Sequence, residues 1–370
     1  MLVLLRNTIL QRLPLECLHR IKTTYIFIYI KALAFEDGVV MQEKVAQINK
    51  LFDVMKIRAH VSSFKEGLRT CQYHIDLGLG EKVSKIRALD EELSLLVRSL
   101  STPQITLDSK LGKVVIETTT TDEPISIPFT SLLHKAQLNN YILPLLVGSD
   151  MAGNPFTMEL AECPHILIGG TTGSGKSILS QTMLESLIHR HDPQDLQLGL
   201  IDPKGTELTK YKESPYCAIY ASNHDSITDT IYKAVDVMED RYKLLSSKGM
   251  SSIHELRKTE KHPYIVLMID ELADILIQDK KEHLYTGLIR LLQKSRAAGI
   301  YIIANTQRPS KDVVTGLMKS VMPTRVALKV ASHYDSRIII DETGAENLVG
   351  KGDMLIKYNG KTTRVQGAII

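Results

Sequence analysis

A glycine-rich string between a predicted strand and a predicted helix carries the strongest chemical signal in this sequence. The string fits the phosphate-binding pattern GxxxxGK[ST], and its residues are Gly170, Thr171, Thr172, Gly173, Ser174, Gly175, Lys176 and Ser177. Glycines let backbone N–H groups turn toward phosphate oxygens, and the start of the helix adds the positive end of its dipole. We expect Lys176 to reach the β- and γ-phosphates of ATP and the Ser177 hydroxyl to ligate Mg²⁺. The alternative is a structural glycine-rich turn.

Two adjacent acids follow a second apolar strand, predicted over Ile265–Ile269. Asp270 is expected to complete the Mg²⁺ shell, and Glu271 to polarise an attacking water as a general base. A glutamate directly after the aspartate favours an ATP-hydrolysing enzyme over a kinase, because a kinase must exclude water. The alternative is an acid pair that only caps the N-terminus of a helix.

Polar residues end the next predicted strand, Ile300–Asn305. A polar side chain at this edge, beside the phosphate-binding loop, can contact the γ-phosphate and sense its loss. We select Gln307 for this role, with Thr306 behind it. The alternative is a capping turn before Pro309.

Composition places the chain among ordinary globular proteins. Its 370 residues are 44% hydrophobic and 24% charged, which predicts two or three domains and argues against disordered, collagen-like and multispanning membrane classes. The four cysteines form no CxxC pair, so neither a zinc site nor a redox pair is expected, and a reducing compartment fits.

Positive charge is concentrated in one segment. The whole chain has a net charge of only +3, yet residues 306–337 contain six basic and two acidic residues. A surface that contacts a phosphate backbone is one interpretation, and a solvated basic face is the other.

The pattern beyond residue 141 alternates strands and helices, which predicts an α/β fold with a parallel sheet covered on both faces. Two runs of apolar residues at helical spacing predict helices that end before Gly249 and Gly299. The dipeptide Asn359-Gly360 predicts a closing hairpin. The predicted strands are His165–Gly169, Gln197–Asp202, Ile265–Ile269, Ile300–Asn305 and Arg325–Val330.

Three segments are expected along the chain. Residues 1–40 form an uncertain apolar and basic extension, interpreted as sequence upstream of a true start at Met41, a membrane-surface helix or a partner-binding arm. Residues 41–140 read as a small α+β domain, in which the threonine run 118–121 is expected to be exposed. Residues 141–370 contain the motifs.

Taken together, these strings closely resemble the FtsK/SpoIIIE family of DNA-translocating ATPases. The similarity is strong over residues 141–370 and extends weakly back through Gly80–Ile86 to the forties. Besides the phosphate-binding loop, the matching strings are Pro164–Ile168, Leu200–Lys204, Met238–Tyr242, Pro263–Asp274, Gln293–Ile300, Thr306–Lys319, Met322–Arg325 and Gly350–Leu355.

The resemblance implies a RecA-like P-loop NTPase motor that forms a homohexameric ring around double-stranded DNA and hydrolyses ATP with Mg²⁺ at subunit interfaces. Arg296 matches the arginine expected to reach a neighbouring subunit's γ-phosphate; by itself it would read as a cation at a helix C-terminus. Arg308, Lys319 and Arg337 match positions expected to face DNA. The resemblance also implies a role in chromosome segregation or mobile-element transfer.

The sequence departs from well-known full-length members in three respects. We see no set of membrane-spanning helices before the motor and no winged helix after it, and the stretch between Tyr242 and Pro263 is short. We therefore expect a cytoplasmic short form that loads on DNA without marked sequence preference, with an unidentified membrane or recombination partner. A family ATPase that powers protein secretion and a non-hydrolysing nucleotide-dependent scaffold remain the alternatives.

Overall fold

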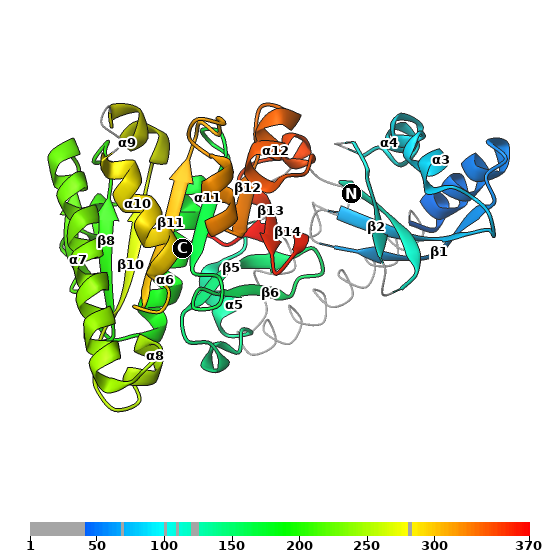
Figure 1. Ribbon diagram of the computed structural model, residues 1–370. Helices are drawn as coiled ribbons and strands as arrows, with labels where there is room; N and C mark the ends of the chain where they lie inside the picture. The colour runs from blue at the N-terminus through cyan, green and yellow to red at the C-terminus, as the bar shows by residue number, and fades with distance from the viewer. Residues whose placement is uncertain (1–40, 68–69, 100–101, 109–110, 120–125, 280–282) are drawn as a thin grey trace, which may run out of the picture. The chain divides into compact units, whose positions relative to one another are not determined.

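The computed structural model describes residues 41–67, 70–99, 102–108, 111–119, 126–279 and 283–370 (Figure 1). The expected extension over residues 1–40 lies outside this range. The chain divides into two compact units, one reaching residue 120 apart from residues 66–70, and one that contains those five residues and 121–370. Within the described residues, no helix has the length and apolar character needed to cross a membrane.

The smaller unit combines a four-stranded sheet with helices. The sheet has the order β1-β2-β4-β3, and its core includes the fully buried side chains of Phe52, Tyr73 and Ile116. Its elements are a helix over 41–54, β1 (Ala59–Glu66), β2 (Thr70–Leu77), α3 (Val83–Arg87), α4 (Asp90–Val97), β3 (Gln104–Asp108) and β4 (Lys113–Thr119). The expected α+β character is therefore observed. The expected exposure of the threonine run is wrong for Thr118 and Thr119, which are buried in β4.

A ten-stranded sheet forms the larger unit, in the order β6-β5-β14-β13-β12-β7-β11-β10-β8-β9. The strands from β12 to β9 pair in parallel, and β13, β14, β5 and β6 extend the sheet through antiparallel pairs. The strands are β5 (Pro144–Asp150), β6 (Pro155–Glu159), β7 (His165–Gly169), β8 (Leu196–Ile201), β9 (Cys217–Ala221), β10 (Tyr264–Ile269), β11 (Ile300–Thr306), β12 (Thr324–Leu328), β13 (Asp353–Tyr358) and β14 (Lys361–Gly367).

Helices cover both faces of this sheet, as expected for a mostly parallel sheet (Figure 1). The helices are α5 (Phe129–Leu133), α6 (Lys176–Arg190), α7 (His224–Lys248), α8 (Ile253–Leu256), α9 (Leu272–Gln278), α10 (His283–Lys294), α11 (Gly316–Val321) and α12 (His333–Ile340), with short 3₁₀ turns at Leu138–Asn140, Thr209–Tyr211 and Ala345–Asn347.

Alternate strand residues supply the two cores. Ile166 and Ile168 of β7 pack in the cluster that contains the apolar face of α6, whereas Leu167 packs in the cluster that contains α7, α9 and α10. This alternation follows from the two-residue period of a strand. It fixes which face of the sheet carries the helix that follows the phosphate-binding loop.

Residues 126–140 pack on the larger unit, although the sequence pattern groups them with the small domain. Phe129, Leu132 and Leu138 cluster with Leu146 and Ala368. The backbone N–H of Phe129 also donates to the carbonyl of Ile369 at 2.8 Å. We therefore propose a domain boundary upstream of residue 126.

Candidate nucleotide site

The predicted phosphate-binding loop connects the end of β7 to the start of α6. Gly173 and Gly175 have φ of 78° and 106°, in the left-handed region that glycine adopts without steric cost. A Cβ atom on Gly175 would lie 2.5 Å from the backbone nitrogen of Gly352, so no side chain fits there. The first turn of α6 contributes N–H groups that have no partner within the helix, which creates an anion site.

Backbone hydrogen bonds from three other segments hold the loop in place. The Gly170 N–H donates to the Thr306 carbonyl at 3.2 Å, and the Thr171 N–H donates to the Lys329 carbonyl at 2.9 Å. On the other side, the Gly352 N–H donates to the Ser174 carbonyl at 2.7 Å. The loop therefore has a fixed conformation set by β11, β12 and the segment that precedes β13.

Lys176 and Asp270 form a buried pair at the carboxyl edge of the sheet. The Lys176 ammonium donates to the Asp270 carbonyl at 2.9 Å and lies 3.4 Å from its carboxylate, and the two side chains are 4% and 2% exposed. Burial raises the pKa of Asp270, with further raising contributions from Asp202 and Glu207, while Lys176 opposes the shift. Lys176, which is expected to bind phosphate, thus contacts Asp270, which is expected to bind the metal.

The donor set fits a magnesium ion. The Asp270 Oδ2 atom is buried and has no hydrogen-bond partner in the described structure, although a buried carboxylate oxygen normally has one. Carboxylate and hydroxyl oxygens are the ligands that Mg²⁺ takes beside phosphates. Asp270 and the hydroxyl of Ser177 at the start of α6 would hold it, and the ion would neutralise phosphate charge when bound.

Glu271 is almost fully buried, at 1% exposure, and both carboxylate oxygens accept hydrogen bonds. The Thr306 hydroxyl donates to Oε1 at 2.9 Å, the Gln307 N–H donates to Oε2 at 2.9 Å, and the Ala273 N–H donates to Oε1 at 3.3 Å. The last contact makes Glu271 the N-cap of α9. The capping role that the sequence left as an alternative is therefore real, and it is compatible with a role as base because the same carboxylate is oriented by β11.

Gln307 connects the acid to the phosphate-binding loop. Its backbone N–H binds Glu271, while its side-chain oxygen accepts a hydrogen bond from the Thr172 hydroxyl at 2.9 Å. This connection arises because β11 lies between β7 and β10 in the sheet. The position suits a residue that senses the terminal phosphate.

A cavity of about 520 Å³ opens beside the loop. Sequence reasoning assigned no role to several residues in its wall, although Lys351 and Gly352 lie in a string that carried the family resemblance. The unassigned wall residues are Ser126, Ile178, Leu179, Glu207, Lys351, Gly352, Gly367, Ala368 and Ile369. A larger hollow of about 660 Å³ elsewhere, lined in part by His189 and Tyr216, contains none of the predicted site residues.

Asp202 is a further acid that the sequence reasoning did not place in the site. It follows β8 and is fully buried, and its carboxylate accepts the N–H groups of Gly205, Glu207 and Leu208 at 2.9 to 3.0 Å. Asp202 thus organises the turn that brings Glu207 to the cavity wall. The sequence signal was an acid at the end of a buried strand, the same signal that identified Asp270.

Arg296 lies away from the loop of its own chain. It is exposed and follows α10 near the amino ends of β7 and β11. Burial lowers the pKa of His165 at the start of β7, and the positive charge of Arg296 adds a smaller contribution in the same direction. The loop follows the opposite end of β7, and five strand residues span about 17 Å. Arg296 therefore remains a prediction for a contact with another subunit.

Within the part of the chain that the structure describes, the basic segment contains exposed cations without an ion pair and cations that pair with Asp341. Arg308 and Arg337 are exposed, whereas the Lys319 ammonium lies 2.7 Å from the Asp341 carboxylate. Arg325 is buried and also lies 2.7 Å from Asp341. These ion pairs lower the pKa of Asp341 although its burial acts in the opposite direction. Arg325 is thus a structural cation.

Comparisons with known proteins agree with this fold. A sequence model of the FtsK/SpoIIIE family matches residues 133–261 and 253–311. The chain is 36% identical over 351 residues to the DNA translocase FtsK of Chlamydia trachomatis, covering 89% of this chain and 44% of that protein. It is 35% identical to the DNA translocase SftA of Bacillus subtilis, covering 90% of this chain and 36% of that protein. The chain thus spans less than half the length of these relatives.

Among solved structures, the pCW3 conjugation coupling protein TcpA, in its monomer form with ATPγS, superposes with a TM-score of 0.62 at 24% identity, covering 88% of this chain and 95% of that one. The Type VII secretion ATPase EccC of Thermomonospora curvata gives 0.59 at 22% identity, covering 66% and 32%. These likenesses support the P-loop ATPase fold. The sequence relatives, together with the family match, show that this chain belongs to the FtsK/SpoIIIE family.

Proposed function

We propose that the chain is an ATP-dependent double-stranded DNA translocase motor. The observation that carries the proposal is the connected set at the carboxyl edge of the sheet: Lys176 on Asp270, Glu271 held by β11, and Gln307 joining Glu271 to the loop. This arrangement supports phosphate binding by Lys176, metal binding by Asp270 and the role of a base for Glu271. The family relatives named as DNA translocases supply the substrate.

In the proposed mechanism, Lys176 moves its ammonium from Asp270 to the β- and γ-phosphates, where it stabilises developing negative charge. Glu271 orients a water for attack on the γ-phosphate and accepts its proton. Gln307 registers the presence of the γ-phosphate through its bonds to the loop and to Glu271. These proposed roles are the ones that the sequence motifs predict.

The assembly part of the proposal is a homohexameric ring that acts in segregation or mobile-element transfer, in the cytoplasm, where ATP and DNA are both found. Arg296 would complete a neighbouring subunit's site, because it is exposed and lies at the edge opposite its own loop. Arg308 and Arg337 would contact DNA phosphates, and Lys319 would do so after leaving Asp341. A further membrane or recombination partner stays a prediction.

The test is the steady-state ATPase rate of the full chain with and without linear duplex DNA. We expect strong stimulation by DNA, loss of hydrolysis in Lys176→Ala, and retained nucleotide binding without turnover in Glu271→Gln. A rate that ignores DNA would refute the translocase and favour the protein-secretion alternative. If the unmodified chain binds nucleotide but does not hydrolyse it, the translocase is refuted and the non-hydrolysing scaffold is favoured.

A further inference from the structure

A lysine held in an unusual backbone conformation forms part of the wall of the nucleotide cavity. Gly350, Lys351 and Gly352 precede β13 and have φ of 92°, 52° and 90°. Three successive left-handed residues make a tight turn, and a lysine at its centre carries a steric cost that glycine would avoid. A residue kept in such a conformation points to a requirement for its side chain.

The turn is fixed on both sides. The Gly352 N–H donates to the loop carbonyl of Ser174 at 2.7 Å, and its own carbonyl accepts from the Gly367 N–H at 2.8 Å. The carbonyl of Lys351 accepts from the buried side chain of Gln366 at 3.0 Å. The Lys351 side chain is thus carried on a rigid support joined to the phosphate-binding loop.

The side chain itself is available to a ligand. Lys351 is exposed and lines the 520 Å³ cavity together with Gly175, Lys176 and Ser177. Among the described residues, no carboxylate lies within ion-pair distance of its ammonium. An unpaired cation beside an anion-binding loop raises the local concentration of phosphate groups.

The order of strands in the sheet indicates which phosphates of the nucleotide Lys351 would contact. Lys176 reaches from the loop toward Asp270, on the side of β7 where β11 and β10 lie, and this is the side of the predicted base. Lys351 approaches from the other side of β7, where β12, β13 and β14 lie. The two lysines therefore flank the phosphate chain, with Lys351 away from the reacting γ-phosphate.

We propose that Lys351 is a second phosphate-binding cation of this site, which binds the α- or β-phosphate of the nucleotide and contributes equally to ATP and ADP binding. The inference rests on the proposed function, because it assumes that the cavity holds a nucleoside phosphate. An interaction that is the same before and after hydrolysis changes KM and leaves kcat unchanged.

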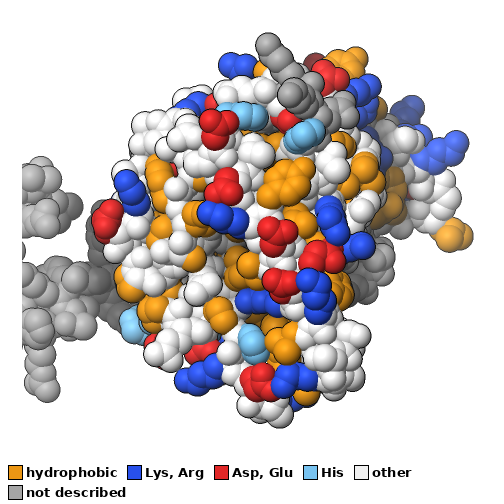
Figure 2. Space-filling view, turned by 60° about the vertical axis from the view of Figure 1, so that its left-hand side comes forward, with side chains coloured by type: hydrophobic (Ala, Val, Ile, Leu, Met, Phe, Trp, Pro, Cys, Tyr) orange, Lys and Arg blue, Asp and Glu red, His pale blue; other side chains and the backbone are white. Residues whose placement is uncertain are grey.

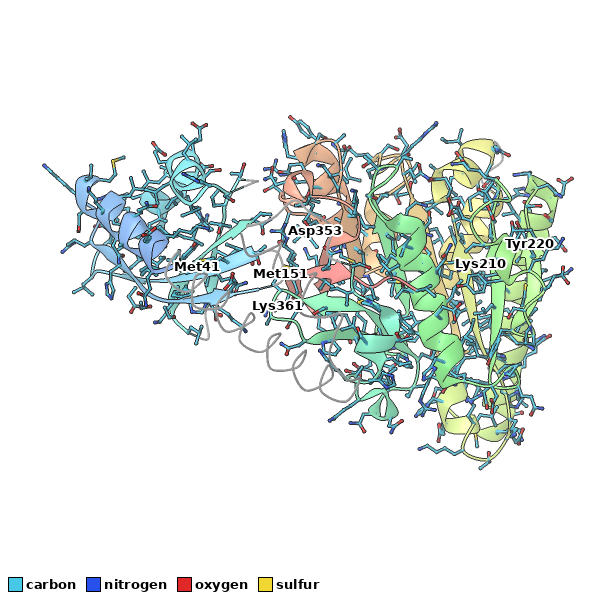
Figure 3. The ribbon with its side chains drawn as sticks, turned by 180° about the vertical axis from the view of Figure 1, so that it is seen from behind. Met41, Met151, Lys210, Tyr220, Asp353 and Lys361 are labelled. Carbon is cyan, nitrogen blue, oxygen red and sulfur yellow. The ribbon has the colours of Figure 1, made fainter. Side chains whose placement is uncertain are left out.

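The experiment measures mant-ATP and mant-ADP binding with Mg²⁺, and steady-state hydrolysis, on the full chain. Lys351→Met should weaken both nucleotides by a similar factor of about 10 and raise KM with kcat retained, since one charged contact is lost. Lys351→Arg should restore most of the affinity. The matched control is Lys361→Met, an exposed lysine at the opposite end of the β13–β14 hairpin (Figure 3).

Lys351→Gly distinguishes the effect of the lysine charge on nucleotide binding from its effect on the conformation of the turn. This variant removes the left-handed strain, so its urea midpoint should not fall, yet it should bind both nucleotides as weakly as Lys351→Met. Wild-type affinity in either variant would overturn the proposal, as would a loss confined to ATP. Lys176→Ala is the reference for the proposed function: if it binds nucleotide as well as the wild type does, the proposed function itself fails.

Discussion

The hydroxyl of Thr306 offers a direct test of how Glu271 works. It donates to the Glu271 Oε1 atom at 2.9 Å from the last residue of β11, and both residues are buried. Thr306→Val replaces the hydroxyl by a methyl group of similar size, so packing is preserved. The change removes one contact of the carboxylate and the acceptor of the Arg308 N–H at 3.1 Å, and it leaves the Gln307 N–H in place.

The size of the expected fall in kcat follows from the burial of Glu271. Glu271 is 1% exposed, so water cannot replace the lost donor, and a hydrogen bond to a charged group contributes about 1.5 to 3 kcal/mol. If hydrolysis requires the observed pose, kcat should fall by roughly 10- to 150-fold, because about 1.4 kcal/mol corresponds to a factor of ten. KM for ATP should change little, since Thr306 makes no contact with the loop side chains that bind phosphate.

The assay is DNA-stimulated ATP hydrolysis, accompanied by urea unfolding to confirm that the variant is folded. Thr306→Ser keeps the hydroxyl and should retain most of the turnover, which distinguishes the hydrogen bond from the loss of packing. Turnover in Thr306→Val that equals or exceeds the wild-type rate would refute the reasoning. In that case the observed pose would be a resting state that Glu271 must leave before hydrolysis.

Three further predictions concern a contact between subunits, the binding of DNA phosphates and a buried histidine. Mixing Arg296→Ala with Glu271→Gln should restore some ATPase activity at interfaces where intact halves meet, and mixed rings that stay inactive would argue against a trans role. Arg308→Ala should lower the log–log salt slope of DNA binding by about 0.9, and Lys319→Ala by less; equal slopes would contradict the pairing seen here. His165 accepts the Ile302 N–H at Nδ1, and burial lowers its pKa to about 3, so its neutral form stabilises the fold above the unfolded pKa. This contribution is lost as pH falls: by itself it makes the free energy of unfolding about 2 kcal/mol lower at pH 5 than at pH 7. His165→Asn should reduce the pH dependence of urea unfolding by about that amount, while His191, whose pKa burial also lowers, keeps its own contribution.

The candidate nucleotide site at the carboxyl edge of the sheet could be predicted because each of its motifs is local in sequence. An apolar run followed by a loop, or by two acids, identifies both a buried strand and the chemistry at its end. Parallel strands place their carboxyl ends together, so Lys176, Asp270 and Gln307 had to meet once the strands were neighbours. The strand pattern also predicted the hairpin, which turns at Asn359 and Gly360.

Other features depend on the order of strands, which no local pattern contains. Lys351 reaches the cavity only because the β13–β14 hairpin returns antiparallel beside β12. Arg364 of the same hairpin forms two hydrogen bonds to the buried Asp353, labelled in Figure 3, at 3.0 and 2.8 Å. Neither residue has a neighbour in sequence that would reveal its contacts. The burial of Thr118 and Thr119 was missed for the same reason.

Charge was predicted less well than motifs, because a count of charges does not show which are paired. On the face in Figure 2, which turns the left side of Figure 1 forward, acidic and basic side chains are interspersed. The described side chains in that view therefore show no separate basic surface for a phosphate backbone. The cations proposed to face DNA must be judged one by one from their contacts.

Asp341 decides how much of the basic segment a DNA phosphate can use. It follows α12 in a left-handed conformation, and its carboxylate lies 2.7 Å from both Lys319 and Arg325 and 3.5 Å from Lys357. A phosphate that binds Lys319 must compete with this carboxylate, whereas Asp341 keeps Arg325 and Lys357 as partners after Lys319 leaves. The loss of Lys319 from Asp341 therefore costs less free energy than the breaking of an isolated buried ion pair, because breaking such a pair would leave a charge without compensation. If Lys319 contacts DNA as proposed, it can therefore bind and release a phosphate while Asp341 keeps two cationic partners.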